Sequence, residues 1–591
     1  MYKSEKYLYV HYEVIDRSGE MILDQFQILK KYFGYDSFRP GQEDLIAAIL
    51  EGKDVLGIMP TGAGKSICYQ VPALCMKGIT IVVSPLISLM IDQVKALNQA
   101  GIYAAYINST LSENQITKAL SNASAGQYKI IYVAPERLET VRFLNFARQV
   151  EISMVTVDEA HCISQWGQDF RPSYLKILKF IEQLEVRPVI SAFTATATPV
   201  VKEDIVKILC LKEPKVLVTG FDRENLYFGV KWNKNKDEQL FDYLQNHLEE
   251  SGIVYCATRK NVDKVWEYLE RRGLPVTRYH AGLTPEERRV NQDDFIFDRK
   301  PVMVATNAFG MGIDKSNVRY VVHYNMPQSL ENYYQEAGRA GRDGASAECL
   351  ILYSPQDTII NRYLIENKND NEEMTQEQAD TVRKQDIERL NAMVGYCKTV
   401  HCLREYILRY FGNNPYKSIA GKYCGNCSVC LKESTSRSYE QYGYGNLWED
   451  TWESGGDPGG YVQGDSFGYD HGSVYREYGE NFGKSKVAGV YGTGYYGEGK
   501  KAEVKKPEGK KLLQDLDPDK QVLYAQLKAK RKEIAAEENI PPYLVFTDRT
   551  LLDMCIKAPR TKADMLKVSG VGENKYSRYG SQFLRCIDEF L

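Results

Sequence analysis

The stretch Met59-Pro60-Thr61-Gly62-Ala63-Gly64-Lys65-Ser66 decides the fold of this 591-residue chain. It follows residues 54–58, a run typical of a buried strand, and it precedes a helical pattern that starts at Ile67. Glycines let such a loop turn its N–H groups towards phosphate oxygens, and the helix adds its positive N-terminal end. We therefore expect Thr61, Gly62, Ala63 and Gly64 to cradle phosphates, Lys65 to reach the β- and γ-phosphates of ATP and Ser66 to ligate Mg²⁺.

Met59 stands where the strict pattern of such a loop begins with Gly, so a chance Gly-Lys-Ser turn is the alternative. Further apolar runs, separated by helical patterns, each end in a polar motif. These motifs occupy residues 84–86, 134–137, 158–161 and 194–198. Short apolar strands that alternate with helices predict a parallel sheet covered on both faces, an α/β fold. Ligands bind beyond the carboxyl ends of such strands, so we expect these motifs to converge on one site.

Asp158-Glu159 is the companion that a phosphate loop needs. An Asp at the end of a strand can hold the Mg²⁺ that bridges two phosphates, and the adjacent Glu can orient and deprotonate the attacking water. Two solvated carboxylates after a core strand are the plain alternative. The Gly-Lys-Ser loop earlier in the same strand-rich region argues against it.

A second series of strands and helices, from about residue 252 to 344, predicts another α/β lobe without a phosphate loop. Its last helical pattern contains Arg339 and Arg342, whose i, i+3 spacing places them on one face if the segment is helical. Such arginines are suited to stabilise charge on a nucleotide bound by the first lobe. A surface salt bridge would explain either arginine alone.

Residues of about 25–430 resemble a RecQ-type DNA helicase of helicase superfamily 2. The resemblance is carried by residues 33–42, 59–66, 158–161, 194–198, 279–283 and 335–344. It implies two RecA-like lobes, ATP in the cleft between them and 3′-to-5′ translocation on single-stranded DNA. It also implies that Tyr35, Arg39 and Gln42 recognise adenine, whose edge a Gln can bind bidentately. The residues alone favour a loop that packs two aromatic rings.

The aromatic-rich loop of the family has its counterpart in residues 164–171. Trp166 and Phe170 are expected to stack on unpaired bases, which contributes roughly 1–3 kcal/mol for each base, with Arg171 beside them. Ordinary core packing of the two rings is the alternative. We expect His161, Thr194 and Thr196 to link the state of the nucleotide to the grip on DNA.

Three thiols are each separated from the next by two residues, a spacing typical of a metal site: Cys424, Cys427 and Cys430. Spacing leaves the fourth ligand open among Cys397, His401 and Cys402, and the resemblance favours Cys402. Zn²⁺ held by four thiolates would be structural, because no coordination position stays open. An iron–sulfur cluster also uses four cysteines and is the alternative.

The composition fits an ordinary globular protein of net charge −3, with 43% hydrophobic residues. No apolar run approaches the roughly 20 residues of a membrane span, and the N-terminus lacks the apolar centre of a signal peptide. Thirteen cysteines, scattered except for the cluster above, argue against a disulfide framework. We therefore expect a cytoplasmic protein, associated with the nucleoid if it is bacterial, that binds no membrane.

Six parts are expected along the chain. They are an N-terminal extension (1–24), RecA-like lobe 1 (25–220), RecA-like lobe 2 (221–355), a helical zinc-binding subdomain (356–435), a linker (436–510) and a small all-helical domain (511–591). Residues 439–500 contain 16 Gly and 10 Tyr, and their net charge is −6. Such a segment cannot bury enough apolar surface to offset its ordering entropy, so we expect disorder. It also shows no periodicity of the winged-helix domain that RecQ-type helicases commonly carry there.

The last part resembles the HRDC domain found at the end of many RecQ proteins. The resemblance is carried by residues 539–548 and 568–572. The turn Gly570-Val571-Gly572, at the start of a helical pattern, is suited to take a DNA phosphate. Because the charge of this region is near balance, a protein-contact module or a merely tethered one explains it equally well.

These patterns predict an ATP- and Mg²⁺-dependent 3′-to-5′ DNA helicase in repair, recombination and replication. Its expected partners are single-stranded and partially duplex DNA, single-stranded-DNA-binding protein and other repair proteins. An RNA helicase or remodeller is one alternative, which the zinc cluster, the aromatic loop and the C-terminal module disfavour. A strand-annealing scaffold without productive unwinding is the other, and it would require damaged motifs.

Deleting residues 439–500 should leave DNA-stimulated ATPase and the unwinding of short tailed duplexes within about twofold, because a segment of net charge −6 does not grip DNA phosphates. A Gly-rich tether of roughly 75 residues spans about 45–50 Å, which lets the C-terminal module touch DNA away from the cleft. Binding to forked DNA, which engages motor and C-terminal module together, should weaken in a fluorescence anisotropy titration. Loss of tailed-duplex unwinding with ATPase retained would assign the deleted residues to strand separation instead.

Overall fold

The computed structural model describes residues 14–15, 21–22, 24–232, 235–309, 315–367, 374–412, 424–431, 517–538 and 540–590. Val14–Ile15 and Met21–Ile22 pair as an antiparallel ribbon. The expected linker 436–510, and with it residues 439–500, lies outside the described residues, as does most of the expected extension 1–24.

Lobe 1 is built on a seven-stranded parallel sheet with the order β5-β6-β4-β7-β8-β3-β9. Its strands are β3 (Val55–Ile58), β4 (Ile79–Val83), β5 (Ala104–Ile107), β6 (Ile130–Val133), β7 (Ile152–Val157), β8 (Val189–Thr194) and β9 (Lys215–Val218). Side chains alternate between two cores, because Leu56 and Ile58 pack in one and Val55 in the other. Strands buried on both faces explain the continuous apolar runs of the sequence.

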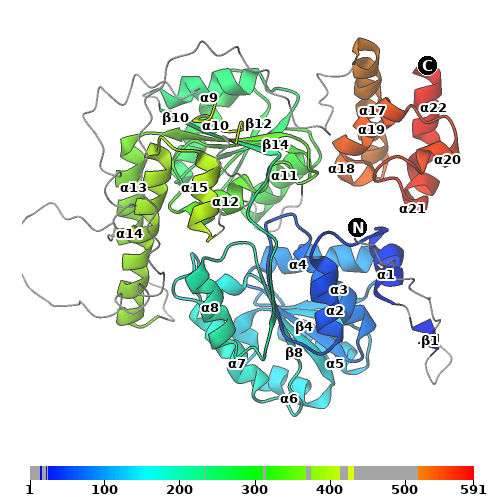
Figure 1. Cartoon of the computed structure of the whole chain (residues 1–591), viewed down its shortest axis with the longest axis vertical. Coiled ribbons are helices and arrows are strands. Elements are labelled where there is room, and N and C mark those ends of the chain that lie inside the picture. The colour runs from blue at the N-terminus through cyan, green and yellow to red at the C-terminus, as the bar shows by residue number, and fades with distance from the viewer. Residues whose placement is uncertain are drawn as a thin grey trace, which may run out of the picture. The chain divides into compact units, whose positions relative to one another are not determined.

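Helices cover this sheet in the blue and cyan part of Figure 1. They are α1 (Gln25–Ile28), α2 (Gln42–Leu50), α3 (Lys65–Cys75), α4 (Ile87–Gln99), α5 (Glu113–Ser124), α6 (Val141–Gln149), α7 (Lys176–Ile181) and α8 (Pro199–Ile208). Helix α5 shows how the sequence sets a boundary, since Ser112 and Gln115 form a reciprocal capping box at its start.

Lobe 2 repeats the plan with a six-stranded parallel sheet of order β10-β15-β14-β11-β13-β12. Its strands are β10 (Leu226–Trp232), β11 (Ser251–Tyr255), β12 (Val276–Tyr279), β13 (Val302–Ala305), β14 (Val318–His323) and β15 (Ala347–Tyr353). Its helices are α9 (Lys236–Gln245), α10 (Arg259–Glu270), α11 (Pro285–Ile296), α12 (Leu330–Ala337) and α13 (Pro355–Glu366). Both lobes were predicted as parallel α/β sheets, and both are confirmed.

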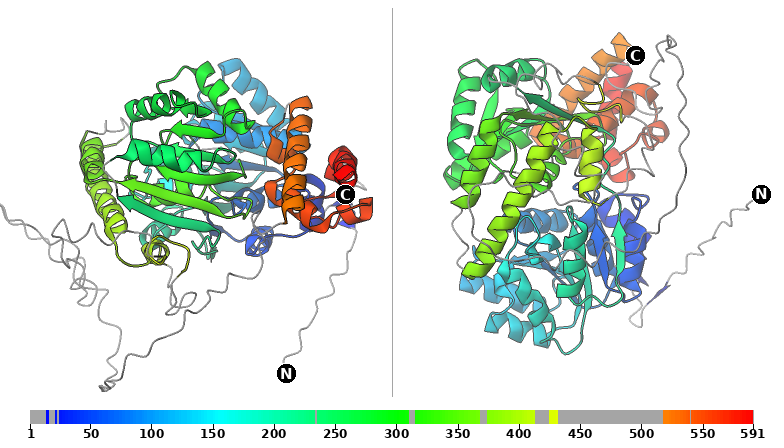
Figure 2. Two further views of the ribbon diagram at one scale, coloured as in Figure 1. Left: turned by 90° about the horizontal axis from the view of Figure 1, so that it is seen from above. Right: turned by 60° about the vertical axis from the view of Figure 1, so that its left-hand side comes forward.

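The next part adds α14 (Gln376–Lys398), α15 (Leu403–Tyr410) and the cysteine-rich loop 424–431. The yellow-green helices α14 and α15 come after lobe 2 in the chain and lie beside it in both views of Figure 2. The loop extends the lobe 2 sheet: the Phe228 N–H donates to the Asn426 carbonyl at 3.4 Å, and the Ser428 N–H donates to the Phe228 carbonyl at 2.9 Å. The cysteine-rich loop is therefore anchored to the first strand of lobe 2.

The C-terminal residues form a small helical domain, as predicted. Its helices are α17 (Pro518–Glu537), α18 (Pro542–Val545), α19 (Asp548–Lys557), α20 (Lys562–Met565), α21 (Glu573–Lys575) and α22 (Ser581–Phe590). The fully buried Arg531 ties α17 to the turn between α18 and α19. It donates to the Phe546 carbonyl at 2.9 Å and pairs with Asp548, the first residue of α19, at 2.7 Å. Among the helices of the described ranges, none has the length and apolar character to cross a bilayer.

Candidate nucleotide site and metal centre

The phosphate loop lies between the buried strand β3 and helix α3, as the sequence predicts. Gly64 caps α3 with a left-handed conformation (φ 82°), and a Cβ there would lie 2.5 Å from Nε2 of Gln42. Lys65 Nζ donates to the Met59 carbonyl at 3.2 Å. The Met59 side chain is buried in the core, so the departure from the strict pattern points away from the loop. The glycine-dependent turn on which the predicted phosphate cradle depends is therefore present.

Gln42 lies beneath this loop. Its Nε2 donates to the carbonyls of Ala63 and Gly64 at 3.1 and 3.0 Å, and its Oε1 accepts from the Arg39 N–H at 2.9 Å. The Arg39 side chain donates to the Gly62 carbonyl, while Tyr35 is 52% exposed. Two of the three residues predicted to recognise adenine, Arg39 and Gln42, therefore contact the phosphate loop, and the exposed ring of Tyr35 is open to stacking.

Asp158 and Glu159 follow β7 at the same edge of the sheet. Glu159 adopts a left-handed backbone (φ 48°, ψ 48°), a strained conformation that costs of order 1–3 kcal/mol and is typical of functional sites. Burial and the neighbouring charge of Glu159 raise the pKa of Asp158. Burial opposes ionisation of Glu159 too, but the hydrogen bond and charge of His161 outweigh it and lower the pKa of Glu159. The two adjacent carboxylates therefore lie in different electrostatic surroundings.

A chain of polar contacts leads away from Glu159. His161 Nδ1 lies 3.3 Å from Glu159 Oε2 and 2.9 Å from Thr194 Oγ1. Thr194 Oγ1 donates to the Thr196 carbonyl at 3.1 Å, and Thr196 Oγ1 accepts from Gln335 Nε2 of lobe 2 at 3.3 Å. The three residues predicted to couple the nucleotide to DNA are thus in contact with one another, and Gln335 extends this chain of contacts to lobe 2.

The aromatic-rich loop begins three residues after His161. A Cβ on Gly167 would lie 2.2 Å from the His161 carbonyl, so only glycine allows this close approach. Trp166 is 44% exposed, whereas Phe170 is 6% exposed and belongs to the core. Burial leaves Phe170 no ring face for a base, so the stacking expected of both aromatics is retained for Trp166 alone. Arg171 bonds the Asp169 carboxylate and the Pro85 carbonyl.

Arg339 and Arg342 lie beyond the end of α12. That helix ends at Ala337, and residues 338–344 form turns, with Gly341 left-handed at φ 57°. The conditional prediction of a shared helical face is therefore wrong, because the helix stops before Gly338. Arg342 still packs on the phosphate loop, since its Cγ lies 3.3 Å from the place of a Cβ on Gly62. The charge of Arg339 also acts on Glu159 and helps to lower its pKa.

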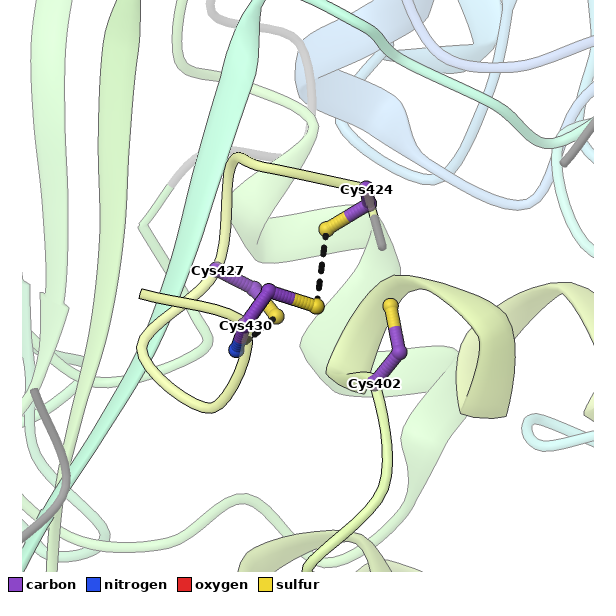
Figure 3. A group of neighbouring side chains, drawn as sticks. All are labelled: Cys402, Cys424, Cys427 and Cys430. Atoms are coloured by element: carbon purple, nitrogen blue, oxygen red, sulfur yellow. Dashed lines mark hydrogen bonds between the residues drawn. The ribbon is translucent and has the colours of Figure 1, made fainter. Parts of the chain in front are cut away.

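Four cysteine sulfurs gather between α15 and the loop 424–431 (Figure 3). Sγ of Cys402, Cys424, Cys427 and Cys430 all lie within 4.8 Å of one another, and Cys424 and Cys430 are 3.7 Å apart. Two thiolates on a tetrahedral zinc ion with bonds of about 2.3 Å lie about 3.8 Å apart, so the four sulfurs fit Zn²⁺. Cys402 is therefore the fourth member, and among the described residues His401 and Cys397 do not join the group.

Comparison with known proteins matches the two lobes, the zinc-binding part and the C-terminal helical domain. Family models match in chain order: DEAD/DEAH box helicase over residues 39–204, helicase conserved C-terminal domain over 235–344, RecQ zinc-binding over 355–431 and HRDC domain over 520–587. ATP-dependent DNA helicase RecQ of Bacillus subtilis is 42% identical over 592 residues, covering 95% of this chain and 98% of that protein. The chain belongs to the RecQ family.

Other relatives match this chain over different extents. ATP-dependent DNA helicase RecQ of Pasteurella multocida is 35% identical and covers 95% of this chain and 93% of its own. A relative from Acanthamoeba polyphaga mimivirus, 38% identical over 408 residues, carries a name that assigns it provisionally to the RNA helicases. It covers 68% of this RecQ-family chain and 71% of its own length.

Four residues that make structural contacts at the site were not predicted from the sequence, because they lie outside the RecQ motifs. Arg223 and Asn225, in the segment between β9 and β10, and Arg404 and Asn426, beside the zinc ligands, donate mainly to backbone carbonyls. Every residue has a backbone carbonyl, so the acceptors of such hydrogen bonds cannot be recognised from residue types or their spacing in the sequence. The only signal was the cluster of polar residues 222–225 in an otherwise apolar stretch.

Cys427→Ser should remove zinc from this RecQ-family chain and lower its melting temperature by roughly 5–10 °C, because metal binding contributes directly to folding. Elemental analysis and a thermal melt of the purified variant measure both effects. His401→Ala, which changes an exposed neighbour outside the cluster, should keep one zinc per chain. Iron in the native protein would contradict the zinc assignment.

Proposed function

We propose that this RecQ-family chain moves 3′-to-5′ along single-stranded DNA and unwinds duplex DNA in repair, recombination and replication. It is an ATP-dependent DNA helicase, and the relatives that support this carry that name over nearly the full length of both chains. The structural observation that carries the proposal is the meeting of the two lobes at the phosphate loop. Thr61 and Gly62 of lobe 1 there contact Arg223 and Arg342 of lobe 2.

The residues divide into distinct roles. Bound MgATP supplies the driving free energy, and its metal neutralises charge on the phosphates. Lys65 and the loop N–H groups would hold phosphates, Ser66 and Asp158 would hold Mg²⁺, and Glu159 would orient and deprotonate water. Arg339 and Arg342 would stabilise negative charge in the transition state, and Tyr35, Arg39 and Gln42 would recognise the base.

Coupling follows from the contacts of Glu159. His161 touches both Glu159 and Thr194, and Thr196 receives a bond from Gln335 of lobe 2. A change at the water-activating carboxylate would therefore reach both the lobe interface and the neighbouring loop that presents Trp166. The exposed Trp166 ring would alternate between grip and release of a DNA base.

The proposal is tested on duplexes that carry a single-stranded tail of either polarity, with and without ATP. We expect unwinding only with a 3′ tail and ATP. Glu159→Gln, the matched control, should keep nucleotide binding but lower the hydrolysis rate by at least about 100-fold and abolish unwinding, because Asp158 remains. Unwinding from a 5′ tail would overturn the polarity.

The substrate is decided by a parallel titration of ATPase with single-stranded DNA and RNA. DNA should stimulate hydrolysis more strongly, as the RecQ relatives named for DNA predict. Stronger stimulation by RNA would favour the RNA helicase alternative. Hydrolysis that neither nucleic acid stimulates would favour the annealing scaffold. Single-stranded-DNA-binding protein and other repair proteins are the proposed partners, at a cytoplasmic, nucleoid-associated location.

Trp166→Ala should leave basal ATPase within about twofold but reduce stimulation by oligo(dT) about tenfold, the effect of losing roughly 1–3 kcal/mol of stacking. Steady-state ATPase against oligo(dT) concentration measures this. Tyr103→Ala is the control, because Tyr103 is an exposed aromatic at the opposite end of the lobe 1 strands, immediately before β5. Equal behaviour of the two variants would exclude a stacking role for Trp166.

A further inference from the structure

The segment that joins the two lobes is enclosed by lobe 2 and by the zinc-binding part. The ring of Phe221 stacks on Phe411, just after α15, with centroids 4.5 Å apart and an interplanar angle of 16°. It meets the ring of Tyr334 in α12 edge-on at 5.8 Å, and Tyr334 Oη donates to the Phe221 carbonyl at 2.9 Å. Phe221 is 3% exposed, so this segment packs as part of the core rather than as a free connection.

Arg223 reaches from this segment to both sides of the nucleotide site. Its Nη1 donates to the Thr61 carbonyl of the phosphate loop at 3.1 Å and to the Gly338 carbonyl at 3.4 Å. Its Nη2 donates to the carbonyls of Ala340 and Gly341 at 3.1 and 3.0 Å. One guanidinium therefore holds the carbonyls of the residues on either side of Arg339, and the carbonyl of the residue directly before Arg342.

The geometry of these four contacts requires an arginine. A guanidinium presents donors in a rigid planar fork, whereas an ammonium group is a single point on a flexible stem. The acceptors belong to two chain segments, the phosphate loop of lobe 1 and residues 338–341 of lobe 2. Burial lowers the pKa of Arg223, but from a value so high that the group stays charged at neutral pH.

The zinc-binding part fixes the backbone of Arg223 in turn. Arg404, two residues after the zinc ligand Cys402, donates to the Arg223 carbonyl at 2.8 Å and also bonds Asp222 and the Leu226 carbonyl. Asn426, between two other ligands, donates to the carbonyls of Glu224 and Leu226 at 3.0 Å each. The metal centre is thus connected to Arg223 through two side chains that flank its own ligands.

We propose that Arg223 is a positioning residue for ATP hydrolysis: it holds the segment of Arg339 and Arg342 against the phosphate loop, and the zinc-binding part sets its place through Arg404. This inference rests on the proposed function, since it concerns the arginines of that same site. It assigns the zinc-binding part a second task besides stability, which is to keep the transition-state arginines in register with lobe 1.

The test uses the full-length, zinc-loaded chain with Arg223→Met and Arg223→Lys. Both variants should lower kcat for oligo(dT)-stimulated ATPase between about tenfold and 100-fold, the range expected for small displacements of catalytic groups. KM for ATP should stay within about threefold, because Lys65 and Ser66 are untouched. Zinc content and oligo(dT) affinity without nucleotide should match the wild type. The Lys variant decides if the Met variant fails to fold.

Arg187→Met is the control for loss of a partly buried arginine. Arg187 pairs with Asp54 at 2.6 Å, below the strands of lobe 1 and away from the loop. This variant should lower the melting temperature and leave kcat within about twofold, because the ion pair with Asp54 and the hydrogen bond to the Cys210 carbonyl that it removes lie away from the nucleotide site.

A double-mutant cycle tests the connection to the zinc-binding part. Arg404→Lys keeps the charge but loses the fork, and it should lower kcat with zinc retained. Combined with Arg223→Met it should cause no further loss, because the two residues act in series. Near-normal kcat in both Arg223 variants, full rescue by lysine, or multiplied losses in the double variant would overturn the inference. A wild-type chain without DNA-stimulated ATPase would instead overturn the proposed function.

Discussion

The balance of charge around Lys65 is the constraint on which the nucleotide site depends. Burial lowers the pKa of Lys65, and the carboxylates of Glu159 and Asp158 oppose that shift. The lysine follows β3 and the carboxylates follow β7, with β8 alone between these strands in the sheet. A parallel sheet brings the carboxyl ends of its strands to one edge. Charged side chains that are distant in the sequence are therefore brought close together by the sheet itself. Thr194 and Thr196, at the end of the intervening β8, complete the row.

The features that could be predicted from the sequence are those whose chemistry fixes residue type and local spacing. A phosphate loop needs glycines before a lysine, and a zinc site needs thiols two residues apart, so residues 62–65 and Cys424, Cys427 and Cys430 were recognisable. Phe170 was not, because an aromatic residue in a loop has the same spacing whether it is exposed or packed. Its neighbour Trp166 shows the other outcome in the same loop.

The end of α12 was predictable but needed a different rule. Gly338 follows the last helical residue, and Gly341 adopts a positive φ, both common signs of a helix end. The i, i+3 spacing of the two arginines concealed this signal. Arg223 was beyond prediction for another reason, since its acceptors are carbonyls, which are present at every position. Only the folded backbone determines which of them a guanidinium can reach.

The anchoring of the interlobe segment confines where the lobes can turn relative to each other. The Thr219 N–H donates to the Ile58 carbonyl at 3.1 Å, so the chain belongs to the lobe 1 sheet as far as residue 219. From Phe221 onward it is packed against α12 and α15 and bonded to Arg404. Gly220, with φ 88°, lies between these two anchored stretches. Glycine has no Cβ to restrict φ and ψ, so rotation at this residue is the least costly way to change the angle between the sheets. Arg223 lies three residues on and bonds both the Thr61 carbonyl of lobe 1 and the segment of the two arginines in lobe 2, so a rotation at Gly220 would act on the one guanidinium that joins these two sides of the nucleotide site.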